Sequence, residues 1–299
     1  MVDTYQFAWA CVQGKAHRKS NPPTPCQDSC AYGNLTEQIQ VAIVSDGAGS
    51  SANSHLASSF CVKRLYEVCD SRTALLQKII DSRKTDPGQE EAIRQEWNNL
   101  SKELFSQTRA DLLEYATNNG YQQASLHCTL ILVVNTPVGV FSANVGDGRA
   151  GCFNGKEVKP LMVPFMTFTA GATYFLIKQG WENVFRSHLL FEEQIDYFFA
   201  CTDGCQDFII DQSAKGPKTG IYDSILGGEA FYDLNLPYHP FFEGTIKSLQ
   251  EASGSNARNE RLHRLIDEGI YCLEGKETVL PSIASPLLDD DKTLVLYYR

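Results

Sequence analysis

Residues 40–47 read Gln40-Val41-Ala42-Ile43-Val44-Ser45-Asp46-Gly47, a short apolar run that ends abruptly at an acid and a glycine. The run is rich in β-branched residues and has the length of a strand, so it predicts a buried strand that delivers an acidic turn. Acids stand at the ends of three further expected strands: Asp147 after 138–145, Asp203 after 197–201, and Asp290 before 293–298. Asp28, in Cys26-Gln27-Asp28-Ser29, is a fifth candidate.

This series of acids favours a metal site. Asp and Gly are good turn residues, which explains any single acid at a strand end. Four such acids are harder to explain in this way, because neighbouring strands bring their ends together and concentrate negative charge. Uncompensated, that charge would repel itself and raise the pKa values of the carboxyl groups. Hard divalent cations relieve the repulsion, and oxygen ligands favour Mg²⁺ or Mn²⁺ over Zn²⁺.

The pattern between the acids predicts a mixture of helices and strands. Helical periodicity predicts helices over 53–68 and about 89–118. Apolar runs over 129–134 and 138–145 predict two strands in a hairpin. Residues 207–254 are rich in Gly, Pro and aromatic residues with weak periodicity, and we interpret them as a loop-rich insertion.

Composition indicates a globular protein without a basic surface. We predict one domain over residues 1–299, since no repeat or low-complexity linker divides the chain. The 26 Lys and Arg residues against 36 Asp and Glu residues argue against binding to nucleic acid or to an anionic membrane. The start of the chain lacks the pattern of a secretory signal, and no apolar run has transmembrane length. The ten cysteines are therefore interpreted as reduced thiols of a cytoplasmic protein.

Together these motifs resemble the metal-dependent protein phosphatase (PPM, type 2C-like) family, in a divergent bacterial-style form. The matching residues occur in the family's order from about residue 13 to 299: Gln27-Asp28-Ser29, Val44-Ser45-Asp46-Gly47-Ala48-Gly49-Ser50, Asn144-Val145-Gly146-Asp147-Gly148-Arg149, Cys201-Thr202-Asp203-Gly204 and Asp290-Asp291-Lys292-Thr293-Leu294-Val295. The resemblance implies an α+β fold, a four-layer α-β-β-α sandwich of two packed antiparallel sheets flanked by helix pairs.

The resemblance also implies an activity and a set of metal ligands. Asp46 would bridge two Mn²⁺ or Mg²⁺ ions, and the carbonyl of Gly47 would complete the coordination of one of them. Asp203 and Asp290 would hold the second ion. The two ions would activate water to hydrolyse phosphoserine or phosphothreonine. The expected partners are phosphorylated protein substrates and a cognate Ser/Thr kinase.

Two further acids receive roles from the same resemblance, and two positions depart from the family. Asp28 would act through metal-bound water, and Asp147 would belong to a weaker third site. The family's phosphate-gripping arginine has no counterpart in the stretch 21–25, and the histidine that commonly follows the first Asp-Gly pair is Ala48 here. We expect His17 to replace the arginine as a catalytic residue, because it lies where the first strand should end.

Arg18 and Lys19 are alternatives to His17, although a solvated basic loop explains them equally well. The segment between Asp147 and Asp203 is short and lacks the family's usual Asp-His turn. These departures leave two other functions open. One is a catalytically weak regulatory module that binds phosphoproteins, and the other is a hydrolase of small phosphate esters.

Overall fold

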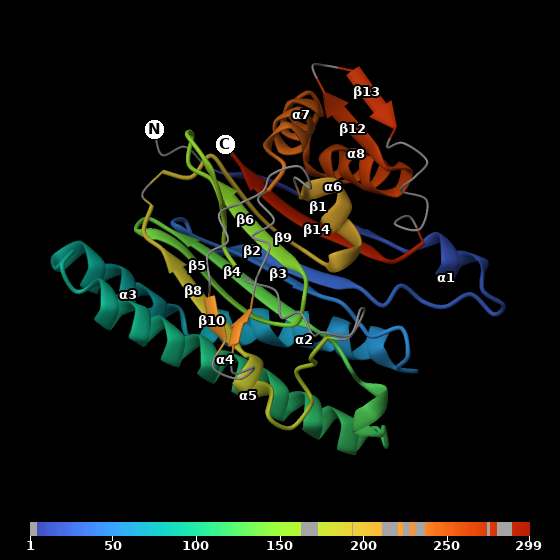
Figure 1. Cartoon of the computed structure of the whole chain (residues 1–299), viewed down its shortest axis with the longest axis horizontal. Coiled ribbons are helices and arrows are strands. Elements are labelled where there is room, and N and C mark those ends of the chain that lie inside the picture. The colour runs from blue at the N-terminus through green and yellow to red at the C-terminus, as the bar shows by residue number, and fades with distance from the viewer. Residues whose placement is uncertain are drawn as a thin grey trace.

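Two antiparallel sheets packed face to face form the centre of the protein, with helices on both outer faces (Figure 1). The computed structural model describes residues 5–162, 173–192, 194–210, 221–223, 228–230, 237–273, 276–279 and 289–299. Within these residues the predicted four-layer α-β-β-α sandwich is confirmed.

The first sheet has the strand order β2-β3-β4-β5-β8. Its strands are β2 (Ser29–Thr36), β3 (Ile39–Ser45), β4 (Leu130–Thr136), β5 (Gly139–Val145) and β8 (Arg186–Leu190). Every residue of β3, β4 and β5 is buried, because helices cover one face of this sheet and the second sheet covers the other. That double burial explains why apolar residues predominate in these strands and why the strands were predictable.

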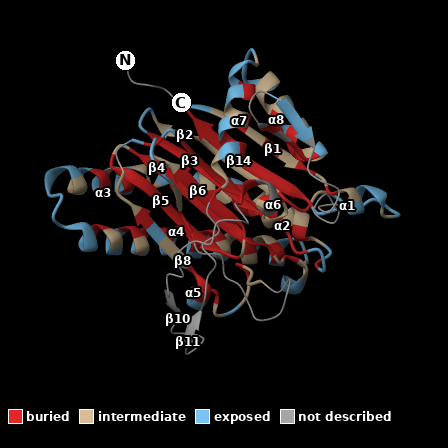
Figure 2. Ribbon diagram, turned by 45° about the horizontal axis from the view of Figure 1, so that its top comes forward, coloured by how far each residue is buried: buried red, intermediate tan, exposed pale blue. Residues whose placement is uncertain are grey.

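The second sheet has the order β1-β14-β9-β6-β7, so the first and last strands of the chain are neighbours. Its strands are β1 (Gln6–Val12), β14 (Lys292–Tyr298), β9 (Tyr197–Cys201), β6 (Arg149–Phe153) and β7 (Val158–Pro160). Where the sheets meet, the rings of Phe198 and Tyr297 stack with centroids 4.7 Å apart. Figure 2 shows these central strands as the most continuously buried part of the fold.

The helices over the first sheet are α2 (Ser54–Ser71), α3 (Thr73–Thr85), α4 (Glu90–Asn118) and the short α5 (Trp181–Val184). The two predicted helices correspond to α2 and α4, which pack side by side on the sheet. The sequence reasoning did not include α3. Its buried residues Leu76, Ile79 and Ile80 have helical spacing, which is a signal that could have revealed it.

The second sheet is covered by α7 (His239–Gln250) and α8 (Ser255–Glu268), followed by a hairpin of β12 (Ile270–Leu273) and β13 (Lys276–Val279). Smaller elements are α1 (Lys15–Lys19), α6 (Gln206–Ile209), the 3-10 turns Gln123–Ser125 and Asp203–Cys205, and a hairpin of β10 (Ile221–Asp223) and β11 (Gly228–Ala230).

The proposed insertion, 207–254, contains α7. Its segments 211–220, 224–227 and 231–236 lie outside the described residues.

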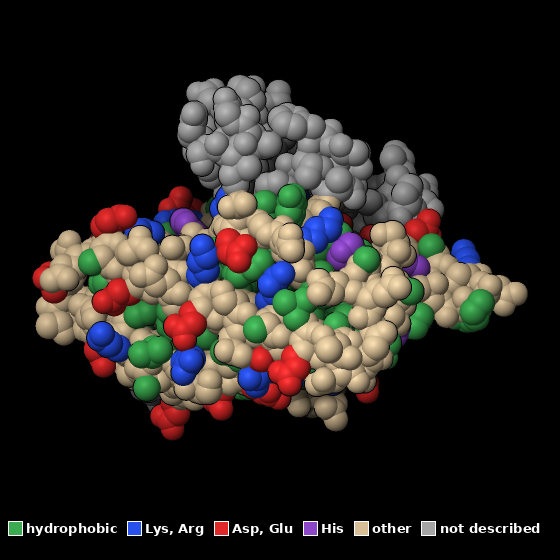
Figure 3. Space-filling view, turned by 90° about the horizontal axis from the view of Figure 1, so that it is seen from below, with side chains coloured by type: hydrophobic (Ala, Val, Ile, Leu, Met, Phe, Trp, Pro, Cys, Tyr) green, Lys and Arg blue, Asp and Glu red, His purple; other side chains and the backbone are tan. Residues whose placement is uncertain are grey.

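The outer surface mixes charges. On the face shown in Figure 3, blue Lys and Arg side chains are interspersed with red Asp and Glu side chains. Such mixing creates no broad positive field on that face. None of the helices in the described part of the chain is long and apolar enough to cross a membrane.

Candidate metal centre

The antiparallel pairing brings the predicted acids to one end of the sandwich. In the first sheet, the start of β2 pairs with the end of β3, and β5 runs in the same direction as β3. Asp28, Asp46 and Asp147 therefore lie next to strand ends on a common edge. In the second sheet, the end of β9 pairs with the start of β14, which places Asp203 and Asp290 at the corresponding edge. The acids thus come from both sheets, and not from one sheet alone.

Asp46, Asp147 and Asp203 form the centre of this cluster. Each offers a carboxylate oxygen, and the three oxygens lie within 4.8 Å of one another. All three residues are partly buried. Three carboxylates so close together fit a hard divalent cation, since oxygen is the ligand that Mg²⁺ and Mn²⁺ prefer.

The electrostatics of the cluster disfavour ionised carboxylates. Burial is the largest cause of the raised pKa of Asp46, and the charges of the neighbouring acids raise it further. Burial likewise raises the pKa of Asp203 to about 7, with additional effects from Asp147 and Asp290. The carboxylates are thus held where their ionised forms are disfavoured, and a bound cation would reverse that preference.

Asp28 supplies an independent indication of a ligand. It is only 4% exposed, and its Oδ2 accepts a hydrogen bond from the Thr202 hydroxyl at 2.7 Å. Its Oδ1 is buried and has no hydrogen-bond partner among the described residues. Buried carboxylate oxygens are normally satisfied by a donor, a cation or ordered water. The orphaned oxygen therefore fits a cation or a water in the cluster.

Asp290 lies beside the three central acids and is not one of them. Its side chain is exposed, and its Oδ1 accepts the backbone N–H of Asp291 at 2.8 Å. Its charge nevertheless contributes to the raised pKa values of Asp46, Asp147 and Asp203. The geometry groups Asp147, and not Asp290, with Asp46 and Asp203.

Asp46 is positioned from both sides by backbone contacts. Its N–H donates to the hydroxyl of Thr129 at 2.9 Å, and its carbonyl accepts the N–H of the same residue at 2.8 Å. The next N–H, of Gly47, donates to the carbonyl of Gln27 at 3.1 Å. The loop that carries Asp28 is therefore tied directly to the loop that carries Asp46.

Glycines beside the acids allow this close packing. A Cβ on Gly47 would lie 2.8 Å from the Gln27 carbonyl oxygen and 2.8 Å from the Cβ of Ser54. A Cβ on Gly204 would lie 1.9 Å from the carbonyl oxygen of Asp291. At these two positions the absence of a side chain lets neighbouring chain segments approach closely. Whether the Gly47 carbonyl also binds a metal stays a prediction.

His17 and Asp291 form a contact at the edge of the cluster. Asp291 is 2% exposed, and its two oxygens accept the N–H groups of Gly14 and Gln27, each at 2.6 Å. His17, on α1, places its Nδ1 3.0 Å from Asp291 Oδ1. Arg18, one of the alternatives to His17, instead forms a two-point ion pair with Asp267. Asp291 received no role from sequence reasoning, although it stands beside Asp290 in the last motif.

Arg149 is a cation that sequence reasoning quoted without a role. It is 6% exposed, and its guanidinium donates to the carbonyl of Gly148 at 3.0 Å and to that of Asp147. Its charge acts to lower the pKa values of Asp147 and Asp203, but burial and the other acids outweigh it. The position of an arginine directly after the second Asp-Gly pair was the available signal.

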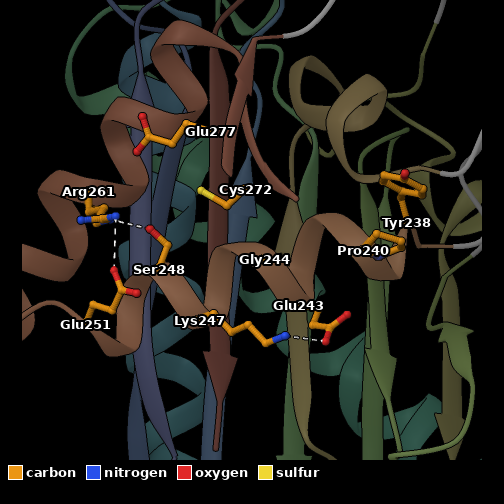
Figure 4. Close-up of a pocket in the computed structure, with 10 residues that line it drawn as sticks. All are labelled: Tyr238, Pro240, Glu243, Gly244, Lys247, Ser248, Glu251, Arg261, Cys272 and Glu277. Atoms are coloured by element: carbon orange, nitrogen blue, oxygen red, sulfur yellow. Dashed lines mark hydrogen bonds and ion pairs between the residues drawn. The ribbon is translucent and has the colours of Figure 1, made fainter. Parts of the chain in front are cut away.

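A pocket of about 620 Å³ lies elsewhere, between α7, α8 and β12 (Figure 4). Four of its charged side chains pair with one another, Lys247 with Glu243 at 2.8 Å and Arg261 with Glu251 at 3.7 Å, and Glu277 pairs with Arg264. None of the five acids lines this pocket. The acidic end of the sandwich therefore remains the candidate active site.

Comparison with known proteins finds a matching family and similar folds. A sequence model described as "Protein phosphatase 2C" matches residues 13–267. The serine-threonine phosphatase 2C from Toxoplasma gondii is similar in structure, with 13% identity over 100% of this chain and 96% of that chain and a TM-score of 0.58. The serine/threonine phosphatase Stp1 from Staphylococcus aureus has 16% identity over 100% and 95%, with a TM-score of 0.50. A search of curated proteins gives no match.

Proposed function

The chain belongs to the protein phosphatase 2C family of metal-dependent serine/threonine phosphatases, and we propose that Asp46, Asp147 and Asp203 hold its catalytic cations. The observation that carries this proposal is the approach of their three carboxylate oxygens to within 4.8 Å. When bound, such cations lower the pKa of a water that attacks phosphorus and neutralise charge on the phosphoryl oxygens.

We further propose Mn²⁺ or Mg²⁺ as the ions, two in number, with Asp46 between them and Asp290 and the Gly47 carbonyl as additional ligands. Asp290 is close enough for its charge to act on all three central acids. An all-oxygen set of this kind suits hard cations. The raised pKa values support the need for positive charge at this place.

Asp28 orients water in this proposal. Thr202 holds Oδ2, so the side chain cannot rotate freely and Oδ1 keeps a fixed direction. Burial raises the pKa of the Asp28 carboxyl group, so its ionised form depends on nearby positive charge. In that form its free oxygen can accept a hydrogen bond from a water and take its proton as that water attacks. The backbone ties from Gln27 to Gly47 and Asp291 keep Asp28 in place.

His17 binds the substrate phosphate in this proposal. Its Nδ1 lies 3.0 Å from Asp291 Oδ1, which leaves Nε2 to face a phosphate oxygen, to which it donates when both ring nitrogens carry a proton. Arg18 is engaged with Asp267 and is therefore the weaker candidate. A histidine at this position would form one hydrogen bond where an arginine would form two.

We propose phosphoproteins as the substrates, a Ser/Thr kinase as the opposing enzyme and the cytoplasm as the location. Family membership supports the substrate class. The ten cysteines are free thiols, which is the usual state in a reducing compartment. The retained acids weigh against a regulatory module without catalysis, because a binding domain has no need of mutually repelling carboxylates. A comparison of turnover on a phosphopeptide with turnover on nucleotides distinguishes a protein phosphatase from a hydrolase of small phosphate esters.

The experiment replaces Asp46 or Asp203 by Asn and measures Mn²⁺ binding by calorimetry and hydrolysis of a phosphopeptide. We expect both binding and hydrolysis to be abolished while the circular dichroism spectrum stays unchanged. Asp81→Asn is the matched control, because Asp81 is an exposed acid on α3, far along the chain from the cluster. Retained Mn²⁺ binding and activity in the Asp46 and Asp203 variants would refute the proposed metal site.

A further inference from the structure

Two cysteines meet beside the acidic cluster. Cys11 lies on β1 opposite Thr293 of β14, and Cys26 lies in the segment that leads to Asp28. Their sulfur atoms are 3.7 Å apart, and both residues are partly exposed. Two thiols in contact at a solvent-accessible position can be oxidised to a disulfide without a large rearrangement of the chain.

A second pair of thiols provides an internal comparison. The sulfur atoms of Cys61 and Cys128 are also 3.7 Å apart, but both residues are 0% exposed in the core between α2 and the first sheet. A dissolved oxidant reaches a buried thiol only after local opening of the fold. The two pairs have the same distance between sulfur atoms but differ in solvent exposure. We therefore expect only the pair of Cys11 and Cys26 to be sensitive to oxidants.

We propose that Cys11 and Cys26 form a reversible disulfide, made by a hydroperoxide, that switches the acidic site off. One sulfur attacks the peroxide oxygen, which gives a sulfenic acid and releases an alcohol, or water from hydrogen peroxide. The second sulfur then attacks the first, the S–S bond forms, and water leaves. The two electrons lost by the sulfurs reduce the O–O bond, and a dithiol restores both thiols.

The switch would act through Asp28. The thiol of Cys11 donates to the Asp28 carbonyl at 3.4 Å, and that of Cys26 approaches the same oxygen at 3.9 Å. In a disulfide neither sulfur carries a hydrogen, so this carbonyl loses both donors. The sulfurs must also close from 3.7 Å to about 2.05 Å, which pulls Cys26 and the adjoining Gln27-Asp28 segment toward β1.

That movement disturbs contacts on which the site depends. Gln27 donates its N–H to Asp291 and accepts the N–H of Gly47, so its displacement loosens both ties. The consequence for activity rests on the proposed phosphatase function, whereas formation of the disulfide does not. A misplacement of the order of 1 Å at a catalytic group lowers activity by up to about 100-fold.

The first arm of the test detects the disulfide itself. The full-length protein is treated with hydrogen peroxide, the remaining thiols are blocked, and the protein is digested with trypsin and Glu-C without reduction. Mass spectrometry should find Cys11 linked to the peptide of Cys26, and Cys26→Ser should abolish the link while Cys30→Ser keeps it. We expect no link between Cys61 and Cys128 under the same treatment. Absence of the first link, or equal formation of the second, overturns the proposal.

The second arm measures phosphatase activity. Peroxide should lower the activity of the wild type by about tenfold or more, and dithiothreitol should restore it. Cys11→Ser should resist peroxide, because serine keeps a hydroxyl donor near the Asp28 carbonyl and cannot form a disulfide. Cys61→Ser should remain as sensitive as the wild type. If the link forms without a change in activity, or if Cys11→Ser is equally inhibited, the regulatory role is wrong. A protein with no activity at all would instead refute the proposed function, since the linked peptide is measured independently.

Discussion

Replacement of Asp291 by Asn isolates the contribution of one buried carboxylate to the site. Asp291 accepts two backbone N–H groups, from Gly14 and Gln27, one on each oxygen at 2.6 Å. Asn has nearly the same shape but only one acceptor oxygen, so its NH₂ group must face one of these donors. One N–H is then buried without a partner, and His17 loses the oxygen beside its Nδ1 or keeps it at the expense of Gln27.

The size of the effect follows from these contacts. A buried polar group left without its partner costs about 1–3 kcal/mol, more when a charged partner is removed. At about 2–4 °C per kcal/mol for a domain of this size class, Tm should fall by about 4–8 °C for a loss of about 2 kcal/mol. If His17 then no longer holds its orientation, its hydrogen bond to the substrate phosphate is lost. A hydrogen bond to a charged group contributes about 1.5–3 kcal/mol, so KM should rise by about 10-fold to 150-fold.

The assay combines thermal unfolding with steady-state kinetics on a phosphopeptide. Asp267→Asn is the matched control. Asp267 is the ion-pair partner of Arg18, which lies next to His17 on α1, but this ion pair is partly exposed and not buried. Such pairs contribute about 0–1 kcal/mol, so this variant should behave almost as the wild type. The reasoning is refuted if Asp291→Asn keeps both the wild-type Tm and the wild-type KM. It is also refuted if the two variants are indistinguishable.

Three further predictions concern the metal-free protein, the glycines and the phosphate contact. The pKa of Asp203 is raised from 3.8 to about 7, so its contribution to stability is present below pH 4 and is lost as pH rises through 7. As pH rises from 4 to 7, the Tm of the metal-free wild type should therefore fall relative to the Tm of Asp203→Asn. A difference in Tm between the two proteins that does not change with pH would contradict this. Gly204→Ala should lower the free energy of unfolding by about 1–3 kcal/mol, because the new Cβ would clash with the Asp291 carbonyl. Gly49→Ala should not, because its Cβ would have its nearest neighbour at 3.7 Å, and denaturant titration of both variants checks this. His17→Ala should raise KM for a phosphopeptide and leave Mn²⁺ affinity unchanged by calorimetry, and a loss of Mn²⁺ binding would place His17 in the metal site instead.

The parts of the fold that sequence predicted are those with a local signal. Strands β3, β4, β5, β9 and β14 are buried on both faces, so most of their residues are apolar and stand in short runs, which Ser142 and Asn144 interrupt in β5. The strands β2, β7 and β8 are largely half-buried, and their mixed composition gives no such run. Helix α8 carries only three fully buried residues on a polar background, so its amphipathic pattern is short.

The candidate site divides in a similar way. An acid at the end of an apolar strand is visible in the chain, and this pattern identified Asp46, Asp147 and Asp203. The backbone N–H groups that Asp291 accepts belong to the distant residues Gly14 and Gln27, and a single sequence does not show which backbone groups will lie within reach. Arg149 bonds to the carbonyls of its neighbours Asp147 and Gly148, but its side-chain partner, Gln206, is also distant. Their roles depend on the register between strands, which is a property of the whole fold.

The position of Asp28 shows why the site depends on both sheets. Asp28 directly precedes β2 of the first sheet, but Thr202, which holds its Oδ2, follows β9 of the second sheet and also accepts the N–H of Thr293 in β14 at 2.9 Å. Gln27 in turn bonds to Gly47, just after β3 of the first sheet, and to Asp291, just before β14 of the second. A small sliding of one sheet on the other would therefore stretch these bonds and separate Asp28 from the central acids. Substitutions that loosen the packing between the sheets, even far from the acids, should consequently weaken metal binding before they unfold the protein.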